Sequence, residues 1–251
     1  MVLPRAFALL RLLANSSDGM TLSNIAADLE VPKSSLSSTL NALADQNFLT
    51  RRGTLYTLGS EAYALASVIL AGRSIRQISR PYLEQGMKMT GETVLLAQLD
   101  QDKQYISYVD TVEPDKSVRL SVPIATRRAL YCSAAGQVFL AHMSDQERDK
   151  YFDATQMEEL TDTTLVKRED LERALDIIRS QGFAMTVGTY YADAAGFACP
   201  VYNADDELVA SVVVGVPVTR AQKETQRFID AVVQVGANIS KTLGYKGSAS
   251  G

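Results

Sequence analysis

The chain has 251 residues, of which 46% are hydrophobic and 22% charged, and its formal net charge is −4. This composition excludes a disordered chain and is typical of one large or two modest folded domains. The net charge excludes a surface that is basic all over, so any contact with nucleic acid is confined to a local patch.

Neither membrane insertion nor export is indicated. The longest apolar runs, 62–72 and 208–218, are far shorter than the roughly 18–20 residues that span a bilayer. Residues 1–13 contain two arginines and no small-residue cleavage site, so we expect no signal peptide. Cys132 and Cys199 are the only cysteines and offer no disulfide framework. We therefore expect a cytoplasmic protein without a membrane partner.

Residues 21–59 have the order of a winged helix-turn-helix: helix, tight turn, helix and short hairpin. Thr21 is a good N-cap for the first helix, and Pro32 suits the first turn of the second. Three leucines share one face of the second helix: Leu36, Leu40 and Leu43. Small hydrogen-bonding residues share the other: Ser34, Ser37, Ser38, Asn41 and Asp45. A helix packed on one side and polar on the other is what a major-groove reader needs.

The hairpin that follows is predicted to pair 48–50 with 55–57 and to carry Arg51-Arg52-Gly53 at its tip, where guanidinium groups can meet phosphate. Most small helical hairpins bind no nucleic acid, but the arginine-tipped wing favours DNA. Acidic residues nearly offset the basic ones, so we expect a dimer or higher oligomer to strengthen binding. The predicted DNA-binding residues are Thr21, Lys33, Ser34, Ser35, Ser37, Ser38, Asn41, Arg51 and Arg52.

Residues 60–88 are predicted to be helical, with Pro81 at a break or in the first turn of a second helix. An apolar stripe runs along the first part: Ala62, Leu65, Ala66, Ile69 and Leu70, with Arg73 and Arg76 beyond it. Such a stripe on a connecting helix is either internal packing or the seam of a dimer.

After Gly91 the pattern changes to strands and helices, and we predict a mixed sheet covered by helices. The predicted strands are 93–99, 105–109, 118–124, 183–187, 197–202 and 208–216. The predicted helices are 133–143, a short one after Ser144, 167–181 and 226–243. The fold class is therefore α+β, and a sheet domain behind a DNA reader suggests ligand sensing.

Catalytic and metal-binding patterns are absent from the sequence. His142 is the only histidine, and no CxxC pair, P-loop or GxGxxG occurs. Ser133 lies in SAAG, which is not the GxSxG elbow. We expect no enzyme activity, no cofactor and no metal.

In both halves the chain resembles the IclR-type bacterial transcription regulators. The matching N-terminal segments are RAFALLRLLA, LSNIAADLEVPKSSLSSTLNALADQNFL and YTLG. Those in the second half are TGETVLLA, SAAG, LAHMS, LTDTTL, LERALDIIRSQGFA, FACPV and LVASVVVGVP. The resemblance implies a winged helix-turn-helix over 1–59, linker helices over 60–88 and a GAF-like effector domain over 89–245, leaving 246–251 as a disordered tail. It also implies dimers, or dimers of dimers, on palindromic operators.

The resemblance further implies that backbone N–H groups at the helix beginning near Ser133 hold the carboxylate of a small organic acid, with Ala134 and Ala135 as donors. Polar side chains that some members place around very small keto acids correspond here to Thr186, Gly196, Val213 and Gly215. Because most of that set is apolar here, we expect a roomier pocket for an aromatic or longer acid rather than glyoxylate or pyruvate; the alternative is a packed core. The predicted effector residues are Tyr131, Cys132, Ser133, Ala134, Ala135, Gly136, Thr186, Gly196, Val213 and Gly215.

The reading helix departs from the family at Ser38, where an arginine is common, so a bidentate guanine contact is absent there. The expected base contacts shift to Asn41, Lys33 and the serines. Three functions remain in comparison: an effector-responsive regulator, acting as repressor or activator; a DNA-binding oligomer with a ligand-free sheet domain; and an enzyme acting on a small organic acid. The first is the prediction, because no acid–base or nucleophile constellation supports the third.

Overall fold

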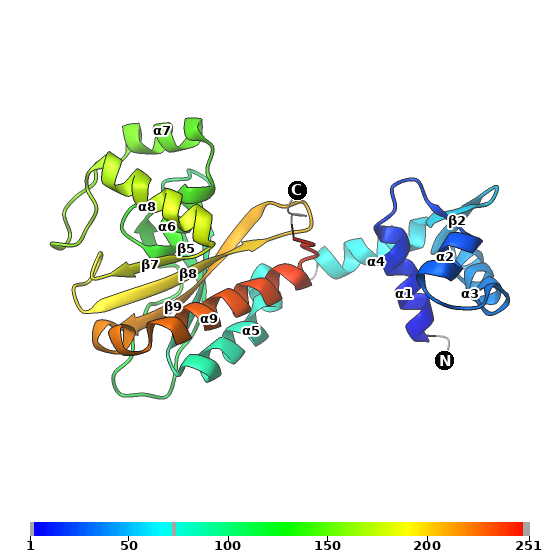
Figure 1. The fold of residues 1–251 in the computed structure, drawn as a ribbon, viewed down its shortest axis with the longest axis horizontal. Coiled ribbons are helices and arrows are strands. Elements are labelled where there is room, and N and C mark those ends of the chain that lie inside the picture. Colours follow the sequence, from blue (N-terminus) through cyan, green and yellow to red (C-terminus); the bar gives the residue numbers. More distant parts are fainter. Residues whose placement is uncertain (1–2, 72–73, 248–251) are drawn as a thin grey trace. The chain divides into compact units, whose positions relative to one another are not determined.

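The computed structural model describes residues 3–71 and 74–247 (Figure 1). The chain divides into a first unit that ends at Ser74 and a second that begins at Ile75. The sequence placed linker helices over 60–88, but the second of them, α5 (Ile75–Thr90), belongs to the second unit. It contains Pro81 without a break and packs against the last helix and the sheet. Of the predicted tail, residues 248–251 lie outside the described part.

The first unit contains the predicted winged helix-turn-helix. Its helices are α1 (Leu3–Ala14), α2 (Leu22–Asp28), α3 (Lys33–Asp45) and α4 (Ser60–Ala71). Its strands β1 (Met20–Thr21), β2 (Leu49–Arg52) and β3 (Leu55–Leu58) form an antiparallel sheet in the order β1-β3-β2. The core contains Leu9, Leu13, Ile25, Ala26, Leu36, Leu40, Leu49 and Tyr56. The leucine face of α3 is therefore the buried face, as its spacing predicts.

Local caps place the two central helices. The Thr21 hydroxyl accepts a hydrogen bond from the Asn24 N–H at 3.2 Å, which confirms the predicted N-cap of α2. Pro32 is the N-cap residue of α3 and stands just before its first turn, one position earlier than predicted. Its extended backbone ends the turn between α2 and α3, and the helix that follows packs Leu36 and Leu40 into the core.

Helix α4 packs little of its surface within the first unit. Tyr63 is 62% exposed and Val68 is 71% exposed, and Leu65 is exposed as well. The side chains of Ile69 and Leu70, and Arg73, lie outside the described part of the chain. Of the apolar stripe, Leu65 and Ala66 are exposed and Ala62 is partly exposed, so Leu65 and Ala66 are not packed within the first unit.

The second unit is built on a six-stranded sheet in the order β6-β5-β4-β9-β8-β7. Its strands are β4 (Thr93–Leu99), β5 (Tyr105–Val112), β6 (Arg127–Ala129), β7 (Ala184–Val187), β8 (Ala194–Tyr202) and β9 (Leu208–Pro217). Neighbouring strands in this described sheet all pair antiparallel, so the predicted mixed sheet is wrong in this respect. The reason is that the helical crossover joins β6 to β7 at opposite edges, where it creates no parallel neighbours.

Helices cover both faces of this sheet (Figure 1). They are α6 (Ala134–His142), α7 (Asp145–Ala154) and α8 (Arg168–Gln181) on one side, and α5 and α9 (Val218–Thr242) on the other. The strand β4 sends Leu95 and Ala97 into the first core and Val94 and Leu96 into the second. None of the described helices combines the length and apolar character that a bilayer-spanning helix needs.

The predicted strand over 118–124 is wrong, because this segment has no regular structure. Its alternating apolar residues suggested a strand, but Pro123 has no N–H to donate and Ala125 has φ +68°. Leu120 packs against the first core and Val122 is buried in it, whereas Val118 and Ile124 are exposed. The alternation therefore reflects contact with the body of the unit rather than pairing in the sheet.

Candidate DNA-binding face and effector cavity

The outward face of α3 carries the predicted reading residues. Lys33, Ser34, Ser38 and Asn41 are exposed, and Ser35 and Ser37 are partly exposed. The hydroxyl of Ser35 donates to the Pro32 carbonyl at 3.0 Å, and that of Ser38 donates to the Ser35 carbonyl at 3.3 Å. These two serines already bond to their own helix. Within the described part of the chain, Lys33 and Asn41 form no such bond, so their polar ends are free for a partner.

The wing differs from the prediction in one respect: Arg51 and Arg52 lie in β2, and the turn is Gly53-Thr54. Gly53 has φ +63°, which a glycine adopts without strain. The Arg51 Nε donates to the Gly53 carbonyl at 2.9 Å, and its guanidinium carbon lies 5.6 Å from the ring centroid of Tyr56. Successive strand residues face opposite sides, so Arg52 points away from these partners. Arg52 is the less engaged of the two guanidinium groups.

The second unit contains a cavity of about 70 Å³ between the sheet and the beginning of α6. Six of the predicted effector residues line it: Cys132, Ser133, Ala134, Thr186, Gly196 and Val213. They come from the start of α6 and from the three strands β7, β8 and β9. The structure thus brings together most of the set that the resemblance implied.

Four predicted residues do not line the cavity. Gly215 lies behind Leu120: a Cβ built on Gly215 would be 2.4 Å from Leu120 Cδ2, so the space expected there is filled by a side chain from another segment. Gly136 contacts the backbone of Leu130, and Ala135 is fully buried one position into the helix. Tyr131 turns aside, where its hydroxyl donates to the Glu158 carbonyl at 3.1 Å.

The beginning of α6 presents unpaired backbone donors at the cavity. The Ser133 hydroxyl caps the helix by accepting from the Gly136 N–H at 3.1 Å. The N–H groups of Ala134 and Ala135 precede the first intrahelical bond, and they have no acceptor among the described residues. Of these two residues, Ala134 lines the cavity. A helix N-terminus of this kind favours an anion.

Sequence reasoning missed the most polar part of the cavity wall. Arg128 lines it, and its guanidinium carbon lies 3.9 Å from the ring centroid of Tyr190 and 5.7 Å from that of Tyr191. Within the described chain Arg128 has no carboxylate partner, unlike the adjacent Arg127, which pairs with Asp100 and Asp102. The available signals were the Arg-Arg pair just before the helix at Ser133 and the Tyr-Tyr pair after β7.

Tyr108 completes this group. It is buried beside the cavity, and its hydroxyl has no hydrogen-bond partner among the described residues. Burial raises the pKa of Tyr108 to about 12, while the nearby charge of Arg128 acts in the opposite direction. The phenol is therefore a neutral donor at physiological pH. A guanidinium, a phenol and helix N–H groups together are suited to one anionic group.

Comparison with known proteins places both units. The model of the IclR helix-turn-helix domain matches residues 2–53, and the model described as bacterial transcriptional regulator IclR C-terminal matches residues 68–241. The chain belongs to the IclR family. It is 27% identical over 252 residues to the transcriptional repressor IclR of Escherichia coli, covering 98% of this chain and 90% of that protein. It is likewise 27% identical over 253 residues to the acetate operon repressor of Salmonella typhimurium, covering 98% and 90%.

A solved repressor structure matches nearly the whole chain. The crystal structure of the Agobacterium tumefaciens repressor BlcR superposes with a TM-score of 0.85 at 19% identity, covering 98% of each chain. At this identity the likeness concerns the fold alone. It agrees with an N-terminal helix-turn-helix domain and a C-terminal antiparallel sheet with helices.

As an IclR-family member, this protein is a DNA-binding transcription regulator, and its relatives are regulators rather than enzymes. Reactive side chains are held in unreactive states. Burial raises the pKa of the Cys132 thiol to about 11, so little thiolate exists near neutral pH. His142 Nδ1 lies 2.8 Å from the Val138 carbonyl of its own helix. Among the described residues no three His, Cys, Asp or Glu side chains gather where they could hold a metal.

Proposed function

We propose that this IclR-family regulator binds a palindromic operator as a homodimer, and that a small carboxylic acid in the cavity of the second unit modulates this binding. The observation that carries the proposal is Arg128, a cavity-lining cation without an ion-pair partner in the described chain, next to the open end of α6. A ligand carboxylate would form an ion pair with Arg128 and accept hydrogen bonds from the free N–H groups at the beginning of α6. Whether occupancy represses or activates transcription depends on where the operator lies.

For DNA, the proposal assigns direct base readout to the exposed face of α3 and phosphate contacts to the wing. Asn41 lies one turn beyond Ser37 on the exposed face, and Lys33 is in the first turn. Thr21 is committed to the α2 cap and would act only through the position of that helix. Arg52 has the free guanidinium of the wing.

We predict that Asn41→Ala relaxes the base preference at one symmetric pair of operator positions. A good bidentate contact between asparagine and adenine contributes about 1–3 kcal/mol of discrimination. The measurement is binding-site selection from a random DNA library with the wild type and the variant. Arg52→Ala is the matched control: it should weaken binding to all sequences alike and reduce the salt slope by roughly 0.9 per lost phosphate contact. Equal loss on every sequence in Asn41→Ala would mean that Asn41 contacts only the backbone.

The dimer is supported by α4, whose Tyr63 and Val68 are exposed and which has no buried side chain among those described. A second copy of the same helix would cover this surface. Two reading helices are needed, because two half-sites are spaced by roughly 34 Å or one helical turn of DNA. A pair of such dimers on adjacent sites would give the dimer of dimers.

For the effector, the wall of the cavity supports an aromatic acid. Tyr108, Tyr190 and Tyr191 line it together with apolar side chains. The cavity of about 70 Å³ is far below the roughly 300–1,000 Å³ of most ligand sites, so a ring fits only when a wall moves. Leu120, which fills the space over Gly215, is the side chain in the way. A two- or three-carbon keto acid needs no such movement.

The test is a thermal-shift panel of benzoate, 4-hydroxybenzoate, phenylacetate, pyruvate and glyoxylate, with benzamide as a neutral control. A ligand at a hundred times its Kd stabilises the folded state by about 2.7 kcal/mol. We expect the aromatic acids to raise the unfolding temperature and benzamide to have no effect. Stabilisation by pyruvate or glyoxylate alone would mean that the effector is a small keto acid and not an aromatic acid. Stabilisation by none of the acids would favour a ligand-free sheet domain, and turnover of any of them would favour an enzyme.

A further inference from the structure

The irregular segment 113–124 between β5 and β6, here called the strap, forms one wall of the cavity. Leu120 and Val122 of the strap line the cavity. Leu120 also lines a surface groove of about 400 Å³ that contains Val118 and Asp193. Leu120 is therefore a strap side chain that the small cavity and the larger groove share.

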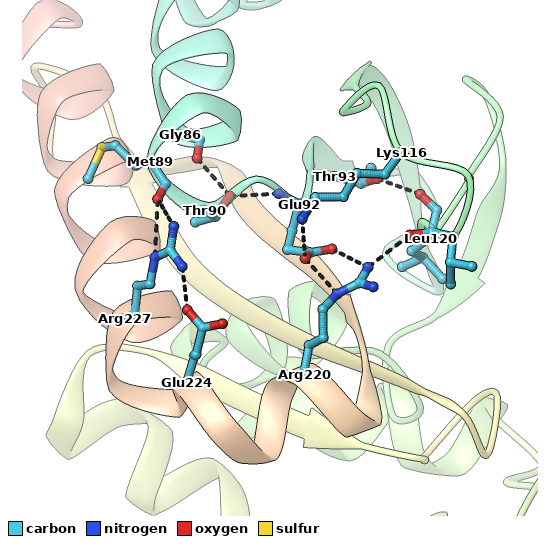
Figure 2. A network of polar contacts seen from close by, with 11 residues as sticks. Gly86, Met89, Thr90, Glu92, Thr93, Lys116, Leu120, Arg220, Glu224 and Arg227 are labelled. Carbon is cyan, nitrogen blue, oxygen red and sulfur yellow. Dashed lines mark hydrogen bonds and ion pairs between the residues drawn. The ribbon is translucent and has the colours of Figure 1, made fainter.

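A buried carboxylate holds this strap in place. Glu92, at the beginning of β4, is 1% exposed and accepts a hydrogen bond from Lys116 Nζ of the strap at 3.1 Å (Figure 2). Arg220 in the first turn of α9 pairs with it as well, with Nε 2.7 Å from Glu92 Oε1. Arg220 also donates to the Val118 carbonyl at 3.0 Å. The neighbouring Thr93 hydroxyl donates to the Leu120 carbonyl at 2.5 Å.

Glu92 and its two cationic partners, Lys116 and Arg220, are here called the clasp. The two cations are not equivalent. The Lys116 side chain is 43% exposed and belongs to the strap, whereas Arg220 is 29% exposed and belongs to a helix. A buried carboxylate without any partner is strongly destabilising. Because Arg220 keeps Glu92 paired, Lys116 can move into water without leaving that carboxylate alone. Opening of the strap is thus separable from unfolding of the lobe.

The same clasp contacts the end of α5. The Thr90 hydroxyl donates to the Gly86 carbonyl at 2.8 Å and accepts from the Glu92 N–H at 3.1 Å. Gly91 turns the chain with φ +65°, and a Cβ built there would lie 3.0 Å from Lys116 Nζ. The ammonium group therefore sits against the C-terminus of α5, where a positive charge is favourable. α5 begins directly after the DNA-binding unit in the chain.

We infer that Glu92 is a positioning residue that clasps the strap beside the effector cavity, and that a ligand larger than the cavity of about 70 Å³ is accommodated when Lys116 and Leu120 release. This inference rests on the proposed function, because the cavity must be the effector site. Release changes the charge at the end of α5 at the same moment as it opens the cavity. Ligand entry is thereby linked to the element that follows the DNA-binding unit.

Two native cysteines provide a test that needs neither ligand nor DNA. Cys132 lines the cavity, whereas Cys199 lies on the other face of the sheet, where it packs in the second core and borders a separate groove. Alkylation of the full chain by N-ethylmaleimide, followed by peptide mass spectrometry, reports cavity opening at Cys132, and Cys199 is the internal reference on the face of the sheet away from the strap. Lys116→Met should raise the Cys132 rate roughly tenfold and leave Cys199 protected, because it removes one partly buried ion pair and permits local opening.

Control variants separate the clasp from general destabilisation. Lys116→Arg keeps the charge and should return the Cys132 rate to that of the wild type. Arg227→Met removes bonds from α9 to the Met89 carbonyl and to Glu224, about two turns after Arg220 and away from the strap, and should leave Cys132 protected (Figure 2). Glu92→Gln should raise the Cys132 rate as Lys116→Met does.

Unchanged Cys132 alkylation in Lys116→Met would overturn the inference. If both cysteines react rapidly in Glu92→Gln, that variant has unfolded. The result for Lys116→Met then tests the inference. If the clasp variants behave as expected but no acid stabilises the protein, the strap opens as inferred and the proposed effector function is what fails. The association rates of two acids of different size provide a second test. Lys116→Met should speed association of 4-hydroxybenzoate and leave that of pyruvate unchanged. Equal effects on both acids would contradict a size gate.

Discussion

Arg128→Met should weaken binding of benzoate, or of whichever acid of the panel gives the largest thermal shift, by roughly ten- to a hundredfold. Hydrogen bonds to charged groups contribute about 1.5–3 kcal/mol, and each 1.4 kcal/mol is a factor of ten. Arg128 stacks on Tyr190 and has no carboxylate partner in the described chain, so the substitution removes a charge that the ligand would pair with. Methionine keeps the length of the aliphatic stem and preserves the packing of this half-buried position.

Arg127→Met is the matched control for this variant. Arg127 is the preceding residue on β6, but it faces Asp100, Asp102 and the ring of Tyr105 instead of the cavity. Calorimetric titration of both variants should show lost affinity only in Arg128→Met. Titration with benzamide adds a second control, because a neutral amide gains little from the guanidinium. Equal benzoate affinity in the two variants would remove Arg128 from the site.

Gly136→Ala should lower the free energy of unfolding by about 3 kcal/mol or more, which is at or beyond the upper end of ordinary overpacking. A Cβ at this position would lie 2.3 Å from the Leu130 carbonyl oxygen and 2.4 Å from Leu130 Cα. These are backbone atoms, so no side-chain rotation relieves the clash. The N-terminus of α6 would have to move away from the preceding segment, and the Ser133 cap and Ala134 would move with it.

Gly196→Ala is the appropriate comparison, because its new methyl group would meet side chains rather than backbone. Its Cβ would be 3.3 Å from Ala134 Cβ and 3.4 Å from Thr186 Oγ1, both in the cavity wall. We expect a clearly smaller loss of stability than in Gly136→Ala, and a smaller cavity, because the neighbours need to shift by only a few tenths of an ångström. Chemical denaturation of both variants measures the difference, and a Gly136→Ala midpoint equal to that of the wild type would contradict the close approach seen here.

Features that depend on neighbouring residues could be predicted from the sequence. The Thr21 cap, the leucine face of α3 and the capping box that Ser144 forms with Glu147 all follow from spacing within one or two turns. The same reasoning failed where the partner is distant in the chain. The alternating apolar residues of 118–124 contact the cavity and the first core instead of pairing as a strand. The order of the strands in the sheet depends on pairings that no local pattern encodes.

The cavity shows the same limit. Carrying over the family positions placed Gly196 and Val213 in the wall, because these lie on neighbouring strands of one sheet. It misplaced Gly215, since the strap that brings Leu120 over it is an irregular segment without a fixed register. Arg128 was missed because an arginine on a short edge strand is ordinary until its partners are seen. Tyr190 and Tyr191 supply that context only in three dimensions.

The central strand β4 has a consequence for how such a regulator diversifies. Its odd-numbered residues Leu95 and Ala97 face the cavity side, and its even-numbered residues Val94 and Leu96 face α5 and α9. Substitutions on the first set can reshape the ligand chamber while the second set keeps the opposite core intact. Ligand specificity and the core that packs against α5 and α9 can therefore change independently. The second unit is thus a suitable starting point for engineering biosensors that respond to other ligands.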